Sequence, residues 1–300
     1  MDNKWTSTKK KVRQTLSAMR PHHYVKNVFV FLPLFFGLHF FNLHRLVAVS
    51  VAFVIFCWVA SAVYIFNDLI DIRADQQHPT KRYRPIASGA MSKRWAYGVI
   101  ASLLGAALIL TACLGQTAVL LVLGYIGLNM VYSLRLKQVA IVDVFVIALG
   151  FFIRLQLGAV VAKTPLSMWI ILMTFLLALF LGFAKRRDDI LLLETGVSSE
   201  IRGSMGGYTL PFLDSTISIL ASGIIVAYLM YTVSDHTIAF VGSANLFYTT
   251  IFVLFGILRY LQITMVLRRS GSPTKILWND GVLQVTLVAW TVGVTWVLYL

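Results

Sequence analysis

Four side chains that can offer oxygen ligands follow the second long apolar run of the chain: Asn67, Asp68, Asp71 and Asp75. Residues three and four positions apart share a helix face, so this spacing predicts that Asn67, Asp71 and Asp75 lie together with Asp68 beside them. Three converging carboxylates repel one another unless they share a cation. Mg²⁺ prefers such oxygen ligands and commonly adds waters and substrate phosphates. We therefore predict a magnesium site formed by all four residues, with Asp68, Asp71 and Asp75 as the catalytic group.

A basic segment, residues 78–89, follows the acidic motif and contains Lys81 and Arg84. Metal-bound carboxylates next to lysine and arginine suit a diphosphate, because the basic side chains can bind the remaining phosphate oxygens. A plainer interpretation stays open. The acids could be a solvated helix end neutralised by Arg73, Lys81 and Arg82, and the loop could be basic because cytoplasmic loops of membrane proteins are basic.

The composition indicates which elements carry these residues. Of the 300 residues, 58% are hydrophobic and 13% charged, and the mean hydropathy is +0.79. Soluble domains carry roughly 25% charged residues, so an ordinary soluble enzyme is excluded and an all-α, polytopic membrane protein is predicted. Basic cytoplasmic loops explain the net charge of +14 without a nucleic-acid partner. Cys57 and Cys113 lie in apolar runs and are expected to pack rather than to do redox chemistry, and residues 1–21 do not resemble a removable signal peptide.

Nine apolar runs approach the roughly 20 residues that a transmembrane helix needs. The predicted spans are Val28–Phe41, Leu46–Phe66, Trp95–Leu114, Thr117–Tyr132, Val139–Val161, Leu166–Phe183, Leu213–Val233, Asn245–Leu267 and Gly281–Leu300. The first run is short and contains Pro33, so eight spans with a re-entrant first segment remain an alternative. This arrangement predicts a basic cytoplasmic or interfacial arm, residues 1–27, and a single transmembrane catalytic domain, residues 28–300.

Basic residues divide unevenly between the two sides of these spans. All 26 lysines and arginines except Arg45, Lys163, Arg154 and Arg259 fall on the side of the N-terminus. This excess marks the cytoplasmic side, so we expect a multi-pass protein of the inner (plasma) membrane whose acidic helix end faces the cytoplasm. Arg154 and Arg259 lie within predicted spans, where a charge is costly. We expect Arg259 to reach a cytoplasmic polar chamber and Arg154 to join helices.

The pattern Asn67-Asp68-x-x-Asp71-x-x-x-Asp75 matches the NDxxDxxxD signature of the UbiA superfamily of intramembrane prenyltransferases, which this chain resembles over its whole length. The resemblance implies a bundle of about nine helices, a cytoplasm-facing polar chamber and Mg²⁺ as cofactor. Segments 20–27, 78–85 and 272–274 are similar to the decaprenyl-phosphate phosphoribosyltransferase branch. That branch transfers 5-phosphoribose from phosphoribosyl diphosphate (PRPP) to a polyprenyl phosphate, releases pyrophosphate and supplies cell-envelope glycan synthesis.

The resemblance also assigns substrate contacts. Aromatic prenyltransferases of the superfamily carry a second motif of DxxxD type, whereas the stretch 132–143 has one aspartate, which favours PRPP as the donor. The predicted substrate-binding residues are Lys26, Asn67, Lys81, Arg84, Tyr132, Lys137, Asp143, Lys185, Arg186 and Arg259. Lys26 is expected to hold the lipid phosphate. Tyr132 and Lys137 taken alone would be an interfacial aromatic and a lysine of a cytoplasmic loop. Prenyl transfer to an aromatic acceptor and membrane transport remain alternatives, the lipid bilayer is an expected partner, and oligomerisation is left open.

Overall fold

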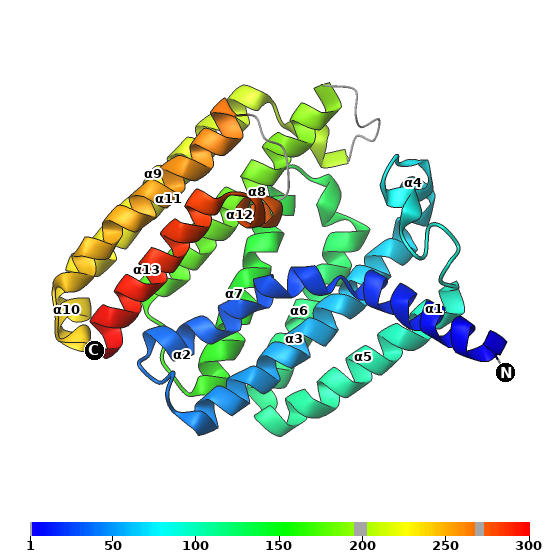
Figure 1. Cartoon of the computed structure of the whole chain (residues 1–300), viewed down its shortest axis with the longest axis horizontal. Coiled ribbons are helices and arrows are strands. Elements are labelled where there is room, and N and C mark those ends of the chain that lie inside the picture. The colour runs from blue at the N-terminus through cyan, green and yellow to red at the C-terminus, as the bar shows by residue number, and fades with distance from the viewer. Residues whose placement is uncertain (1, 195–202, 268–272) are drawn as a thin grey trace. The chain divides into compact units, whose positions relative to one another are not determined.

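The structure is a computed structural model that describes residues 2–194, 203–267 and 273–300. Within these ranges every regular element is a helix (Figure 1). The long apolar runs explain this architecture, because a backbone in lipid must satisfy its own hydrogen bonds and a helix does so within one segment. The predicted all-α membrane fold is confirmed.

Eight helical segments in the described part of the chain are long and apolar enough to cross a membrane. Seven are single helices: α3 (Leu43–Ile70), α5 (Lys93–Leu114), α6 (Gln116–Leu134), α7 (Val142–Ala162), α8 (Met168–Glu194), α9 (Leu210–Val233) and α13 (Gly281–Tyr299). The eighth, Asn245–Val266, joins η5 (Asn245–Thr249), α11 (Thr250–Leu261) and the π-helical η6 (Gln262–Val266). The remaining elements are α1 (Asp2–Met19), η1 (Pro21–Phe31), α2 (Leu32–Phe36), α4 (Ile72–Gln77), η2 (Lys81–Tyr83), η3 (Leu136–Gln138), η4 (Gly203–Gly207), α10 (Asp235–Val241) and α12 (Pro273–Asn279).

The first predicted span, Val28–Phe41, is wrong. Its residues lie in the 3₁₀ helix η1 and the five-residue helix α2, which is followed by Leu38 at a φ of 59°. Helix η1 runs directly into α2, and Pro33, which lacks an N–H group, lies in the first turn of α2, where that donor would have no partner within the helix. The alternative with eight spans therefore agrees with the structure.

The described residues form two compact units. The first contains residues 2–137 and 150–165, and α3 lies at its centre, packed against η1, α1, α5 and α6. Val30, Ile55, Phe56 and Leu157 are among the fully buried residues of its core. Near the end of α3 a smaller apolar cluster around Ile65 receives Ala18 of α1. This cluster fixes the end of α1 beside the acidic motif.

The second unit contains residues 138–149, 166–194, 203–267 and 273–300. Helix α8 packs along α9, and α11 packs against α9 and α13. Gly182 of α8 permits a close approach to the first turns of α7, because a Cβ atom there would meet Cγ1 of Val144 at 2.5 Å. The predicted single catalytic domain after an N-terminal arm stays a prediction.

Candidate active site

The acidic motif spans a bend in the backbone. Helix α3 ends at Ile70, α4 begins at Ile72, and Asp71 between them has φ −89° and ψ 11°. The spacing of the motif predicted one continuous helix, and the bend changes which side chains share a face. Asp68 and Asp75, each 2% exposed, point into the protein, whereas the side chain of Asp71 is 34% exposed.

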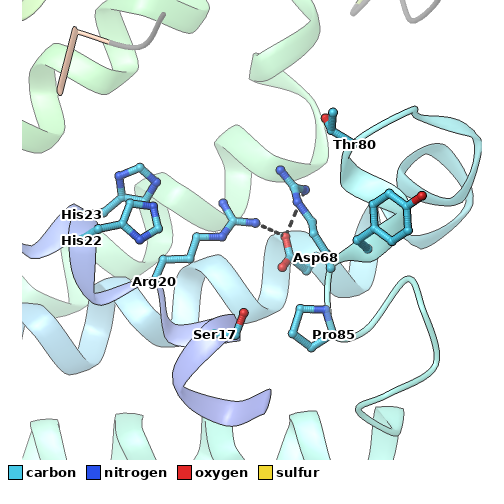
Figure 2. Close-up of a pocket in the computed structure, with 9 residues that line it drawn as sticks. Ser17, Arg20, His22, His23, Asp68, Thr80 and Pro85 are labelled. Atoms are coloured by element: carbon cyan, nitrogen blue, oxygen red, sulfur yellow. Dashed lines mark hydrogen bonds and ion pairs between the residues drawn. The ribbon is translucent and has the colours of Figure 1, made fainter. Parts of the chain in front are cut away.

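Two arginines hold the buried carboxylates. Arg84 Nη1 lies 2.6 Å from Asp75 Oδ2 and 3.2 Å from Asp68 Oδ1, so one guanidinium bridges both acids. Arg20 Nη2 lies 2.5 Å from the same Asp68 oxygen, and Figure 2 shows its side chain extended towards Asp68. Arg20 follows the last residue of α1 and adopts a left-handed turn with a φ of 54°. This turn changes the chain direction between α1 and η1 next to the acidic motif.

Asn67 and Asp71 of the acidic motif contact the end of α6 and the turn after it. Lys137 Nζ lies 2.5 Å from Asp71 Oδ1, and Ser133 Oγ donates a hydrogen bond to Asn67 Oδ1. The structure therefore brings the predicted residue Lys137 to the acidic motif, 66 residues away in sequence. Tyr132, next to Ser133 on α6, is half-buried.

A cavity of about 360 Å³ opens beside Asp68. Its lining residues, most of them labelled in Figure 2, are Ser17, Arg20, His22, His23, Asp68, Thr80, Tyr83, Arg84 and Pro85. Small-molecule sites in proteins have volumes of about 300–1,000 Å³, so this cavity is large enough for part of a ligand. The rings of His22 and His23 are 4.2 Å apart at one side of it.

Sequence reasoning did not select Arg20, His22 or His23 as site residues. The two histidines lie within the predicted basic arm, residues 1–27, and Arg20 lies within the segment 20–27 that carries the family resemblance. One signal was present: Arg20 immediately precedes Pro21, which marks a chain turn at the end of a polar helix. No local pattern gives its pairing with Asp68, 48 residues away.

The donor set fits a magnesium ion that shares its ligands with a substrate. Asp68 Oδ2 is buried and has no hydrogen-bond partner among the described residues. Such an unsatisfied oxygen is costly, and it is the ligand type that Mg²⁺ prefers. In the described ranges no three His, Cys, Asp or Glu side chains are close enough to hold one ion. The three carboxylates do not converge as predicted, because Asp71 turns towards Lys137 while Asp68 and Asp75 share Arg84.

A second buried polar network lies in the second unit. Asp143 and Arg186, both at most 1% exposed, form an ion pair with Nε 2.6 Å from Oδ2. Tyr208 donates a 2.7 Å hydrogen bond to Asp143, and burial together with this bond raises the pKa of the Tyr208 hydroxyl. Arg186 also contacts Asp189 at 3.0 Å. Asp143 and Arg186, both predicted to bind substrate, are therefore bound to each other, and Lys185 beside them on α8 is half-buried.

Three further basic residues differ in their surroundings. Arg259 lies 2.8 Å from Asp280, whose side chain accepts a 2.9 Å hydrogen bond from the Leu283 N–H at the start of α13. Arg259 thus stabilises a helix end in this structure.

Lys26 on η1 is half-buried, and burial lowers its pKa to about 8, with added repulsion from Arg154 and Arg20. Lys81 starts η2 and is half-buried. Ser272, part of a segment that carried the resemblance, lies outside the described residues.

Arg154 is buried inside the first unit. Its guanidinium donates to Asn27 Oδ1 at 2.8 Å, to the Gly150 carbonyl at 2.9 Å and to the Tyr125 hydroxyl at 2.7 Å. The centre of the guanidinium also lies 5.5 Å from the centroid of the Phe56 ring. These contacts join α7, η1, α6 and α3, in agreement with the structural role expected from the sequence.

Comparison with known proteins identifies the family. The profile of the UbiA prenyltransferase family matches residues 28–279, which is most of the chain. The chain belongs to the UbiA prenyltransferase family. The match confirms the family that the acidic motif resembles.

Relatives within the UbiA family include curated enzymes. The chain is 33% identical to the decaprenyl-phosphate phosphoribosyltransferase of Corynebacterium glutamicum, over 95% of this chain and 86% of that protein. It is 32% identical to the enzyme of the same name from Mycolicibacterium smegmatis, over 93% and 91% of the two chains. A UbiA homolog from Archaeoglobus fulgidus, solved bound to GPP and Mg²⁺, aligns with a TM-score of 0.70 at 18% identity, covering 96% of this chain and 100% of that one. This last likeness confirms the fold.

Proposed function

We propose that this protein is a phosphoribosyltransferase that moves 5-phosphoribose from PRPP to a polyprenyl phosphate and releases pyrophosphate. The observation that carries the proposal is the contact of Arg20 and Arg84 with Asp68 and Asp75 beside a cavity. This arrangement offers metal-binding carboxylates and phosphate-binding guanidiniums at one place. The names of the relatives that match nearly the whole chain support the same donor and acceptor.

The reaction has one physical problem, which is the charge on the leaving pyrophosphate. An oxygen of the lipid phosphate forms a bond to C1 of the ribose, the bond between C1 and the diphosphate oxygen breaks, and the electron pair leaves with pyrophosphate. Asp68 and Asp75, with Asn67 and Asp71 as further oxygen ligands, would hold Mg²⁺, which would supply Lewis-acid neutralisation of that charge.

The protein's own cations add to this neutralisation. Arg20 and Arg84 contact carboxylates in this structure, and we propose that they exchange these partners for diphosphate oxygens when PRPP binds. Arginine suits the exchange because its planar guanidinium forms paired hydrogen bonds with carboxylate or phosphate. Lys81 adds a further donor from the same loop. No general base is required, because the lipid phosphate is already anionic and needs only to be positioned.

The remaining contacts are assigned by charge and hydrogen-bonding capacity. We propose that Lys26 holds the acceptor phosphate and that Tyr132 and Lys137 contact the ribose or its 5-phosphate. Lys185 is proposed as a further phosphate ligand. The predicted roles of three other residues require that a contact in this structure opens first. Asp143 and Arg186 would have to separate from each other, and Arg259 would have to leave Asp280.

The positive charge of the N-terminal arm and of alternate loops supports a location in the plasma membrane with the active site facing the cytoplasm. PRPP is a soluble, phosphorylated sugar, so this orientation presents the site to the compartment that holds the donor. The polyprenyl acceptor comes from the bilayer. The phosphoribosyl lipid is then proposed to serve as a precursor of cell-envelope glycans.

The test uses purified protein in liposomes with labelled PRPP, a polyprenyl phosphate and Mg²⁺. We expect labelled lipid and pyrophosphate in equal amounts, and no product after EDTA treatment. Asp68→Asn is expected to reduce turnover by about a hundredfold or more, because it removes a charged ligand of the metal ion that would neutralise the leaving group. The matched control is Asp235→Asn, which alters an exposed acid at the start of α10 and should leave turnover unchanged.

Either of two outcomes would contradict the proposal and assign a different function. Product formed from a polyprenyl diphosphate and a hydroxybenzoate, with none from PRPP, would assign aromatic prenyl transfer. Counterflow of a labelled solute across the liposome membrane, with no labelled lipid from either donor, would assign transport.

A further inference from the structure

Helix α1 carries a dense group of cations that the proposed reaction does not use. Lys9, Lys10, Lys11 and Arg13 are all exposed and lie within five positions. Val12 and Leu16, one helical turn apart, are 54% and 50% exposed on the same helix. An exposed apolar stripe beside clustered lysines is typical of helices that lie in a membrane interface. Helix α1 is not among the candidate membrane spans.

The contacts of α1 place it beside the start of a candidate membrane span. Thr15 Oγ1 accepts a 3.1 Å hydrogen bond from the indole N–H of Trp95, and Lys11 Nζ lies 5.9 Å from the centroid of that ring. Trp95 belongs to the first turn of α5, a candidate span that begins at Lys93. The end of a spanning helix lies where the hydrocarbon meets the head groups, and tryptophan and tyrosine prefer this zone. Trp95 and Tyr97 are 48% and 59% exposed there.

The orientation of α1 about its own axis leaves Val12 and Leu16 exposed. Helical spacing of three and four residues puts Lys11, Thr15 and Ala18 on one side, and Ala18 is fully buried against the protein. Val12 and Leu16 lie next to this side and are open. The view in Figure 1 shows α1 crossing near the start of α5, as these contacts require.

We propose that α1 is a docking surface for the anionic leaflet of the membrane. Val12 and Leu16 enter the acyl region, and Lys9, Lys10, Lys11 and Arg13 bind anionic head groups. Charge complementarity selects this partner, because a neutral bilayer would satisfy the apolar stripe and leave four cations without counter-charges. Each basic residue near an anionic leaflet strengthens partitioning by about fivefold.

The docking surface is continuous with the candidate active site. Ser17, in the last turns of α1, and Arg20, directly after it, both line the cavity, and Arg20 contacts Asp68. Lipid bound along residues 9–16 would therefore hold the segment that supplies Arg20. The inference itself concerns α1 and the bilayer, so it stands or falls independently of the donor sugar.

The experiment measures hydrogen exchange of the α1 backbone in the full-length protein. The protein is reconstituted in nanodiscs of phosphatidylcholine alone or of phosphatidylcholine mixed with phosphatidylglycerol. We expect the amides of residues 9–19 to exchange at least about tenfold more slowly in the anionic discs than in the neutral discs. High salt should remove most of this difference, because it screens surface charges. Amides of α6 should exchange equally in both kinds of disc.

Two variants separate charge from packing. Lys9→Gln/Lys10→Gln/Lys11→Gln/Arg13→Gln removes the four cations and should abolish the difference between the discs. The matched control, Lys9→Arg/Lys10→Arg/Lys11→Arg/Arg13→Lys, keeps every charge and should preserve it. Equal protection of the unmodified protein in both discs would overturn the proposal and assign the position of α1 to its contacts with Trp95 and the cluster around Ala18. A lipid effect that persists in the glutamine variant would also overturn it.

Discussion

The ammonium nitrogen of Lys137 lies 2.5 Å from a carboxylate oxygen of Asp71, although 66 residues separate the two. The contact joins the turn after α6 to the bend between α3 and α4. It also has an electrostatic consequence, because the lysine and a divalent cation would compete for the same carboxylate. Magnesium and PRPP should therefore respond in opposite directions to the loss of this lysine.

We predict that Lys137→Met strengthens the binding of Mg²⁺ alone by a few-fold and raises the KM for PRPP. The first effect follows from the removal of a competing charge at a partly exposed site, where such interactions are modest. The second follows from the loss of a phosphate or ribose contact. Calorimetric titration with Mg²⁺ and initial rates against PRPP measure the two effects. Arg135→Met, which alters an exposed cation in the same turn, is the control, and weaker Mg²⁺ binding in Lys137→Met would contradict the prediction.

Lys26 should give the binding of the acceptor a dependence on pH. Burial lowers its pKa to about 8 and the charges of Arg154 and Arg20 act in the same direction. The lysine is mostly cationic at pH 7 and mostly neutral at pH 9, so its attraction for a lipid phosphate is present below pH 8 and is lost above it. We expect the KM for polyprenyl phosphate to rise by about tenfold between these two values of pH.

The control for this pH dependence is Lys26→Arg. Arginine keeps its charge throughout this range, so the variant should bind the acceptor with a KM that changes little between pH 7 and pH 9. A rise of equal size in the variant would show that another group causes the dependence.

The ionisation of Lys26 should also make the stability of the folded protein depend on pH. Its pKa in the folded protein lies below the ordinary value of 10.5, so the folded state disfavours the charged form. This unfavourable contribution is fully present below pH 8 and disappears as the pH rises from about 8 to 10.5. Thermal stability should therefore increase over that window more in the unmodified protein than in Lys26→Met.

Arg154 should contribute strongly to stability and little to chemistry. Its guanidinium donates three hydrogen bonds in the buried part of the first unit, and lysine cannot reproduce their geometry. We predict that Arg154→Lys lowers the free energy of unfolding by about 2 kcal/mol or more, because buried acceptors such as Asn27 Oδ1 lose their donor. Thermal unfolding in detergent measures the change, with Arg94→Lys at an exposed position as the control. An unchanged melting temperature would refute the structural role.

Gly158 should tolerate no side chain, because a Cβ atom there would lie 2.0 Å from the carbonyl oxygen of Val30. The obstacle is backbone, which cannot rotate away. Gly158→Ala is expected to destabilise the protein by about 1–3 kcal/mol. Gly105→Ala is the matched control: this residue also lies inside a helix, but nothing lies within 4 Å of the added atom. The control should be neutral or stabilising by up to about 1 kcal/mol, and equal effects of both changes would contradict the packing of η1 against α7.

The sequence predicted the helical membrane fold because hydropathy reports directly on what a bilayer requires. The resemblance named Lys137 as a substrate contact, and the structure brings this lysine to Asp71. The predictions from sequence failed where the spacing of residues along the chain no longer indicates the local structure. The bend at Asp71 separates side chains that a continuous helix would bring together, and the run that begins at Val28 was apolar enough for a span but formed a 3₁₀ helix and a short α-helix instead.

The sequence identified the acidic residues of the motif, but it did not identify which basic residues pair with them. The spacing of a motif fixes neighbours within one helix, whereas Arg20 reaches Asp68 across 48 residues through a left-handed turn. Asp143 and Arg186 illustrate the same limit. The resemblance assigned each of them a substrate contact, and the structure pairs them in a buried salt bridge.

The bridge from Arg84 to Asp68 and Asp75 bears on which ions the resting protein can collect. A stray calcium or magnesium ion in the cell would have to displace a guanidinium without offering it a new anion, which makes occupation by the metal alone unfavourable. A sugar diphosphate that arrives with its own magnesium supplies both replacements in one event. If the proposed reaction holds, the site would thereby discriminate between a free ion and a complete substrate before any chemistry begins.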